Sequence, residues 1–190
     1  MYIMKYFETI KCNDSEVFNL EYHQKRITKT IGLNINLSEY IYPPNENLLK
    51  CKVIYDKTGI LDISFLEYTP KEISIFQIII DDKIEYKYKM MNRDMIDNLM
   101  TQKKDAHEII IVKNGLVTDT SIANIAIYNG KDWITPKTPL LEGTCKARML
   151  EDKKIISRDI TIQQLKEAKK IALMNAMIDF KIINNFDIII

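Results

Sequence analysis

Short runs of β-branched and aromatic residues recur along the chain, and turn residues separate them. Runs of this kind predict strands, here at residues 2–10, 51–56, 60–68, 73–80, 84–89, 109–112, 116–118, 125–128, 133–135, 171–174 and 180–183. Lys57-Thr58-Gly59 and the Asn-Gly pairs at 114–115 and 129–130 are typical of tight turns between antiparallel strands. Because such turns join neighbouring runs, the pattern indicates hairpins and argues against a doubly wound parallel sheet.

Helical periodicity is confined to a few segments. Apolar residues spaced by three or four predict helices, and residues typical of helix caps precede them: Asn13-Asp14-Ser15 before a helix that ends at Gly32, Asn92 before a helix through Met100, Gly143 before a helix through Leu150, and Thr161 in a capping box with Gln164. Few helices among many hairpins indicate an α+β fold. The polar turn near residue 81 predicts a small N-terminal lobe, residues 1–83, and a larger strand-rich C-terminal lobe, residues 84–190.

The composition favours a globular protein without an extended charged surface. Hydrophobic residues make up 46% of the chain, enough for a core, and the formal net charge is +1 without a block of like charge, so we expect no nucleic-acid partner. No apolar run reaches the roughly 18 residues that span a bilayer, and the N-terminus lacks a signal-peptide pattern. These features predict a cytoplasmic protein without membrane contact. The three cysteines and two histidines form no ligand pattern, so we expect no metal.

Two basic residues in the first half of the chain are candidates for chemistry. Lys89 ends the alternating run 84–89, and Lys87 faces the same side. A lysine in a closed pocket loses hydration, which lowers its pKa and lets the amine form a Schiff base; an exposed lysine on an edge strand is the alternative. Arg26 can bind a phosphate with two parallel hydrogen bonds, or lie solvated at the surface. His23, three residues earlier, can orient Arg26 or pack beneath it.

The segment from Asn114 to Arg148 offers a carboxylate and an anion-binding turn. A buried Asp119 facing a pyridine nitrogen would keep that nitrogen protonated; an aspartate that satisfies local turn donors is the alternative. Gly143-Thr144 at a helix start presents backbone N–H groups to an anion, although a plain helix start has the same pattern. Cys145 is as consistent with a small buried residue as with a reactive one.

Taken together, these segments resemble the class IV aminotransferase family, the pyridoxal-phosphate enzymes that include D-amino-acid and branched-chain aminotransferases and aminodeoxychorismate lyase. The resemblance runs along nearly the whole chain. Four motifs carry it in the family's order: Phe7-Glu8-Thr9-Ile10, His23-x-x-Arg26, residues 117–125 (VTDTSIANI), and Thr135-Pro136 followed by Leu141-Glu142-Gly143-Thr144.

The resemblance implies a two-lobed, D-amino-acid-aminotransferase-like fold with pyridoxal 5′-phosphate (PLP) as cofactor. Lys89 would form the Schiff base and act as the catalytic base, with Lys87 as its rival. Lys89 is preferred because residues 89–93 resemble the K-x-x-x-R run of lyase-type members. The other implied site residues are Arg26 for the phosphate, Asp119 for the ring nitrogen, Asn124 as a further cofactor contact, the backbones of Thr144 and Cys145 for the phosphate, and Asn175 and Ala176 for the substrate.

Two departures from the family pattern bear on activity. The family usually has Glu where Asp119 stands, and the shorter side chain loses about 1.5 Å of reach. The chain, with 190 residues, is also short for the family.

Residues 7–11 and 173–177 look more like aminodeoxychorismate lyase than like the aminotransferases. The resemblance therefore favours a lyase that releases pyruvate and 4-aminobenzoate. An aminotransferase acting on D- or branched-chain amino acids and a non-catalytic binding protein are the alternatives. It also implies a small-molecule amine or amino-acid substrate and a homodimer.

Overall fold

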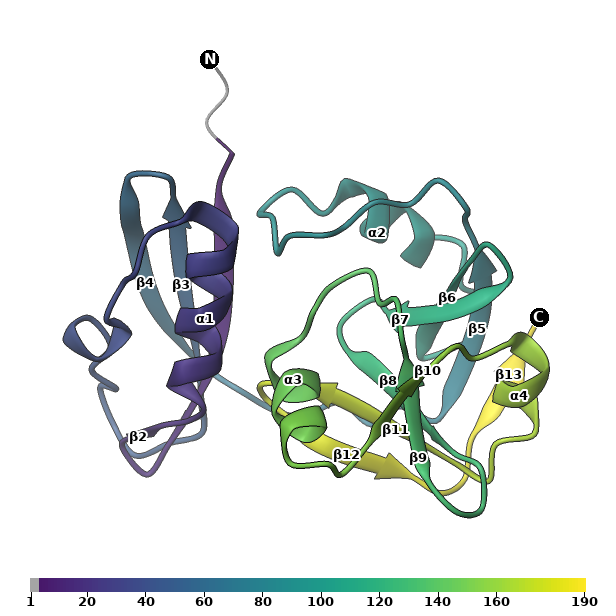
Figure 1. The fold of residues 1–190 in the computed structure, drawn as a ribbon. Coiled ribbons are helices and arrows are strands. Elements are labelled where there is room, and N and C mark those ends of the chain that lie inside the picture. Colours follow the sequence, from purple (N-terminus) through teal and green to yellow (C-terminus); the bar gives the residue numbers. More distant parts are fainter. Residues whose placement is uncertain (1–3) are drawn as a thin grey trace. The chain divides into compact units, whose positions relative to one another are not determined.

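The computed structural model describes residues 4–190, which form two compact units (Figure 1). The first unit contains the chain up to Pro70 together with Tyr88–Asn92, and the second contains Lys71–Lys87 and Arg93–Ile190. The predicted division at residue 83 differs from this one, because Lys89 belongs to the first unit. Backbone contacts explain the difference: Phe7 donates to the carbonyl of Lys89 at 2.9 Å, a long-range bond that no local turn signal reveals.

The first unit is a four-stranded antiparallel sheet with one main helix. The sheet order is β2-β1-β3-β4, and the elements are β1 (Tyr6–Asn13), β2 (Glu16–Val17), α1 (Leu20–Ile31), the 3-10 helix η1 (Leu37–Glu39), β3 (Leu49–Asp56) and β4 (Gly59–Glu67). Along β1 every second residue is buried, as expected for a strand with one face on a core. Helix α1 lies against the sheet (Figure 1) and buries His23 and Ile27. The predicted hairpin around residues 57–59 is confirmed.

Two details at the start of the chain differ from the sequence prediction. The predicted cap, Asn13-Asp14-Ser15, is instead the turn between β1 and β2, with positive φ at Asp14 and Ser15. Helix α1 begins later, at Leu20, and Gly32 ends it as predicted. The same polar residues favour caps and turns, and the pairing of Cys12 with Val17 selects the turn. Residues 2 and 3 of the predicted first strand lie outside the described residues.

The second unit is built on a nine-stranded sheet in the order β10-β9-β8-β7-β6-β5-β13, from which β11 and β12 branch at β8. The pairs β5–β6, β13–β5 and β10–β9 are parallel, and the others are antiparallel. Its elements are β5 (Ile75–Ile80), α2 (Asp94–Met100), β6 (Glu108–Lys113), β7 (Leu116–Thr120), β8 (Asn124–Tyr128), β9 (Trp133–Pro136), α3 (Thr144–Glu151), β10 (Ile156–Arg158), α4 (Ile162–Lys166), β11 (Lys170–Asn175), β12 (Asp179–Ile183) and β13 (Asp187–Ile189).

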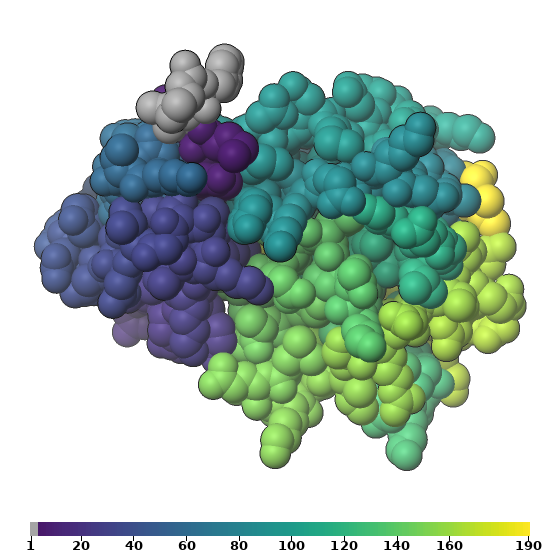
Figure 2. Space-filling view, turned by 45° about the horizontal axis from the view of Figure 1, so that its top comes forward, coloured from purple at the N-terminus to yellow at the C-terminus, as the bar shows by residue number. Residues whose placement is uncertain are grey.

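Most of these elements confirm the sequence prediction, including the Thr161–Gln164 capping box and the start of α3 after Gly143. The predicted strand at 84–89 is wrong. Its side chains alternate as predicted, with Ile84 and Tyr86 buried, but none of these residues belongs to a strand of the described structure. The short strands β10 and β13 were not predicted. Strand β13 pairs with β5. The C-terminal residues (yellow) lie at the surface of the second unit (Figure 2).

The core of the second unit places the ends of β7 and β8. Apolar side chains of the central strands fill it, among them Phe76, Ile110, Val112, Ile125, Ile127 and Leu173. A tight turn joins β7 to β8, because the hydroxyl of Thr120 accepts from the Ala123 N–H at 3.0 Å. Asp119 and Asn124 are therefore directly opposite each other across this turn. Within residues 4–190, helices of the length and apolar character needed to cross a bilayer are absent.

Candidate functional site

Helix α1 and strand β1 hold a buried cluster of Glu8, His23 and Arg26. Arg26 binds Glu8 with two parallel hydrogen bonds, from Nε to Oε1 at 2.8 Å and from Nη2 to Oε2. His23 Nδ1 lies 2.6 Å from the same Oε2 atom. The three-residue spacing puts His23 and Arg26 on one face of α1, above the inward-facing Glu8. His23 therefore orients Glu8, and Glu8 in turn orients Arg26.

The charges of this cluster are fixed at neutral pH. Burial disfavours the Glu8 carboxylate, but the charge of Arg26 and the hydrogen bonds from His23 and Arg26 outweigh it and lower the pKa of Glu8 to about 2. Burial lowers the pKa of His23, although the hydrogen bond and the charge of Glu8 oppose this; the charges of Arg26 and Lys89 add to the lowering. At pH 7 the cluster thus contains a carboxylate, a guanidinium and a neutral imidazole. Glu8 occupies the guanidinium edge formed by Nε and Nη2.

Lys89 lies beside this cluster in the first unit. Its backbone is joined to β1 through Phe7, and its Nζ atom lies 4.7 Å from the centroid of the Phe7 ring. The side chain is half-buried, whereas Lys87 is exposed. Of the two candidate lysines, Lys89 is the one whose charge influences His23.

Asp119 is a buried carboxylate with both oxygens anchored. Oδ1 accepts a hydrogen bond from Asn124 Nδ2 at 2.6 Å, and Oδ2 accepts one from the Leu141 N–H at 2.9 Å. Burial raises its pKa to about 6, although these hydrogen bonds and the charge of Lys146 oppose the rise. Its partners are a facing side chain and a distant loop, rather than the local turn donors of the alternative interpretation. Asp119 can therefore gain or lose a proton close to neutral pH.

The loop before α3 is packed tightly onto Asn124. Asn124 Nδ2 also donates to the Leu141 carbonyl at 2.9 Å, and a Cβ atom at Gly143 would lie 1.9 Å from Asn124 Oδ1. The φ of Gly143 is −75°, so this close approach, and not backbone conformation, requires the glycine. Helix α3 begins directly after it, and the N–H groups of its first turn have no acceptor within the helix.

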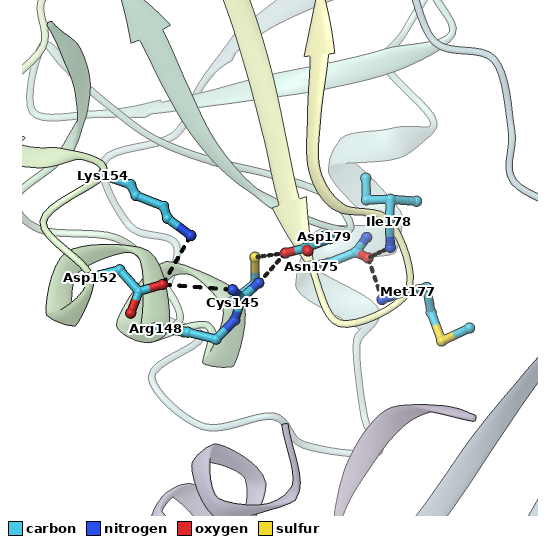
Figure 3. A network of polar contacts seen from close by, with 8 residues as sticks. All are labelled: Cys145, Arg148, Asp152, Lys154, Asn175, Met177, Ile178 and Asp179. Carbon is cyan, nitrogen blue, oxygen red and sulfur yellow. Dashed lines mark hydrogen bonds and ion pairs between the residues drawn. The ribbon is translucent and has the colours of Figure 1, made fainter. Parts of the chain in front are cut away.

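The first turn of α3 is buried, and Cys145 belongs to it. Its thiol donates to Asp179 Oδ1 at 3.3 Å, and burial raises its pKa to about 12. Figure 3 shows this contact beside Arg148, which also binds Asp179. The thiol is protonated at neutral pH, which makes it a poor nucleophile there. A role of Cys145 in anion binding would rest on its backbone N–H.

Asn175 and Ala176 lie where β11 turns into β12. Asn175 Oδ1 accepts hydrogen bonds from the N–H groups of Met177 at 2.9 Å and Ile178 at 3.0 Å (Figure 3), and Nδ2 donates to the Ile122 carbonyl at 3.3 Å. The Asn175 side chain thus closes the turn and ties it to the β7–β8 turn. A substrate contact here would use the backbone of these two residues.

The predicted site residues divide between the two units. Arg26 and Lys89 belong to the first, and the second holds Asp119, Asn124, Thr144, Cys145, Asn175 and Ala176. Two residues close to these were not predicted as site residues: Glu8 and Lys146. Glu8 could have been found, because it is a charged residue on the face of β1 that is otherwise apolar and buried. Lys146 gave no signal, since α3 is too short for a clear apolar stripe.

Comparison with known proteins identifies the family. The sequence profile described as Amino-transferase class IV matches residues 75–185. A Haemophilus influenzae protein of uncharacterised function is 34% identical over 182 residues, covering 90% of this chain and 96% of that protein.

Solved structures agree with this match. A crystal structure from Haemophilus somnus, provisionally named a 4-amino-4-deoxychorismate lyase, is 33% identical with a TM-score of 0.85 and covers 97% of this chain and 99% of its own. The PLP-bound form of a hypothetical aminotransferase from Mycobacterium tuberculosis shares the fold, with 15% identity, a TM-score of 0.74, and coverage of 96% of this chain and 81% of its own.

These matches confirm the predicted fold, and the resemblance found in the four sequence motifs is correct. The profile covers more than half of the chain, and the Haemophilus proteins match it over nearly their whole length. The chain belongs to the class IV aminotransferase family.

Proposed function

We propose that the chain is a PLP-dependent enzyme with aminodeoxychorismate lyase-like activity, releasing pyruvate and 4-aminobenzoate. The observation that carries the proposal is Asp119, a buried carboxylate held by Asn124 and Leu141 beside the start of α3. The similarity to the Haemophilus somnus protein, over nearly the whole of both chains, favours the lyase.

The residues of the second unit fit the cofactor's ring and phosphate. Each carboxylate oxygen can accept more than one hydrogen bond, so Asp119 retains acceptor capacity for a protonated ring nitrogen. The pKa of Asp119 is about 6. A positive charge that faces the carboxyl group lowers this pKa, so a protonated ring nitrogen would complete the ionisation of Asp119. The N–H groups of Thr144 and Cys145, at the positive end of the α3 dipole, are assigned to the phosphate. Asn124 holds Asp119 and the loop, so its contribution to cofactor binding is through them.

The residues of the first unit fit an anion and a covalent attachment point. Arg26 is assigned to the phosphate. The Glu8 carboxylate fixes the orientation of the Arg26 guanidinium group before any ligand arrives, which lowers the entropic cost of binding. When bound, PLP supplies an aldehyde and an electron-withdrawing ring that stabilises negative charge on the substrate carbon. Lys89 is assigned to the covalent attachment and, once released as an amine, to proton transfer at the substrate.

An aminotransferase acting on D- or branched-chain amino acids is the second candidate. Lyase and aminotransferase share the same first steps and the same residues, so the set of assigned side chains is compatible with both. The backbone of Asn175 and Ala176 is assigned to the substrate carboxylate in either case. We further propose that the enzyme is cytoplasmic and works as a homodimer. Sedimentation of the purified chain would test the homodimer.

The cofactor assignment is tested by reductive attachment. Purified chain should take up PLP with a new absorption band near the border of the visible and ultraviolet, and borohydride should fix the cofactor to Lys89, as peptide mass spectrometry would show. Lys89→Ala should lose this attachment, whereas Lys87→Ala, at the exposed neighbour, should retain it. A colourless chain that takes up no added PLP would contradict the proposal and favour a non-catalytic binding protein.

The activity is tested by a pair of assays. Pyruvate release from aminodeoxychorismate supports the lyase, and amine transfer from D- or branched-chain amino acids to 2-oxoglutarate supports the aminotransferase. Lys89→Ala should abolish whichever activity is present, since both depend on the same amine. Amine transfer without pyruvate release would reject the lyase assignment.

A further inference from the structure

Lys146 is a buried lysine with no role in the site as described so far. Only 2% of the residue is exposed, and lysine is rarely buried to this extent unless it is paired. It lies on the first turn of α3, and its Nζ atom donates to the carbonyl of Pro136 at 2.9 Å. One carbonyl satisfies a hydrogen bond but does not offset the cost of moving an ammonium charge out of water. A further compensating charge is therefore needed.

Two carboxylates provide that charge, Glu142 and Asp119. Burial lowers the pKa of Lys146, and the negative charges of Glu142 and Asp119 raise it again. The Glu142 residue is exposed, so water screens its share, whereas Asp119 is buried. The attraction is reciprocal, because Lys146 lowers the pKa of Asp119. Besides Lys146, the groups that face Asp119 are the Asn124 amide and the loop N–H groups of Leu141 and Leu140.

Lys146 and Asp119 also hold the two ends of one loop. Lys146 binds the loop at Pro136, where β9 ends, and Asp119 with Asn124 binds it at Leu141. The loop between them leads directly into α3. The position of the first turn of α3 relative to Asp119 therefore depends on both anchors.

We propose that Lys146 is a positioning residue for Asp119: its buried ammonium group favours the ionised carboxylate, and its bond to Pro136 holds the loop on which that carboxylate is anchored. The catalytic meaning of this pair rests on the proposed function, since an ionised Asp119 is the form that pairs with a protonated ring nitrogen. Lys146 acts through Asp119, and the proposal assigns it no contact with the cofactor.

The test is a titration of Asp119 in the cofactor-free chain, followed by NMR of 13C-labelled aspartate carboxyl groups. Lys146→Met keeps the length of the side chain and removes its charge, so the pKa of Asp119 should rise by about one unit, the scale of a single nearby charge. Lys137→Met removes an exposed lysine from the same loop and should leave the titration unchanged. Equal titration of Asp119 in both variants would overturn the proposal.

A second measurement decides the matter even if Lys146→Met does not fold. The 15N signal of the Lys146 amine in the unaltered chain should be that of an ammonium group throughout the pH range in which Asp119 titrates. A neutral amine at pH 6 would overturn the proposal, because it could not favour the carboxylate.

These readouts do not involve the cofactor, so they separate the two proposals. If Asp119 responds to Lys146 but the chain takes up no PLP, the proposed function fails and the electrostatic link is supported. If PLP binds and Asp119 does not respond, the proposed function stands and the role of Lys146 is rejected.

Discussion

Gly143→Ala tests the packing that joins Asp119 to the start of α3. The added Cβ would lie 1.9 Å from Asn124 Oδ1, where ordinary contacts begin at 3.4 Å. One of the two groups must then move by about 1.5 Å, since neither backbone nor amide can be compressed. The Asn124 amide is bonded at 2.6 Å to Asp119 and at 2.9 Å to the Leu141 carbonyl. A movement of this size breaks at least one of these bonds.

The expected cost follows from these two effects. Overpacking costs about 1–3 kcal/mol, and losing a hydrogen bond to a charged group costs about 1.5–3 kcal/mol. We therefore expect Gly143→Ala to destabilise the chain by about 3 kcal/mol, which lowers Tm by roughly 6–12 °C for a protein of this length. Thermal unfolding of the cofactor-free chain, followed by circular dichroism, measures this change.

A double-mutant cycle with Asn124→Ala identifies the cause. Asn124→Ala removes the atom that the new Cβ would strike, so Gly143→Ala should cost much less in that background. An equal cost in both backgrounds, or no cost in the unaltered chain, would refute the assignment of Gly143 to close approach.

Three further predictions concern the titrating groups. The pKa of Glu8 falls from an ordinary value of 4.5 to about 2 on folding, so its ionisation contributes about 3 kcal/mol to the free energy of unfolding. This contribution is present above pH 4.5 and is lost as the pH falls towards 2. Glu8→Gln should remove it, as urea unfolding at several pH values would show. The pKa of Asp119 rises on folding from 3.8 to about 6, so the cofactor-free chain should lose stability as the pH rises through that interval, and Asp119→Asn should flatten the slope. Cys145 should resist thiol reagents at pH 8 in the folded chain and react after unfolding, because burial raises its pKa to about 12; rapid native labelling would contradict this.

The sequence alone determined the elements whose signals are local. One helix ends at Gly32 and another begins after Gly143, as expected. The turn residues at 57–59 and 114–115 join the strands of the two predicted hairpins. The order of the four motifs was sufficient to identify the family. Helix caps and turns use the same residue types, and there the local signals failed. Asn13-Asp14-Ser15 forms a turn instead of a cap, because the pairing of β1 with β2 decided between the two.

Tertiary structure decided the contacts that join distant segments. The partners of Arg26 and Asp119 are Glu8 and Leu141, and no spacing rule connects residues so far apart along the chain. The same holds for the 84–89 segment, which alternates like a strand but forms none in the described structure, and for Lys146, whose burial depends on the chain around α3. Periodicity and turn chemistry act over a few residues, whereas burial, charge pairing and strand partnership depend on which segments the fold brings together.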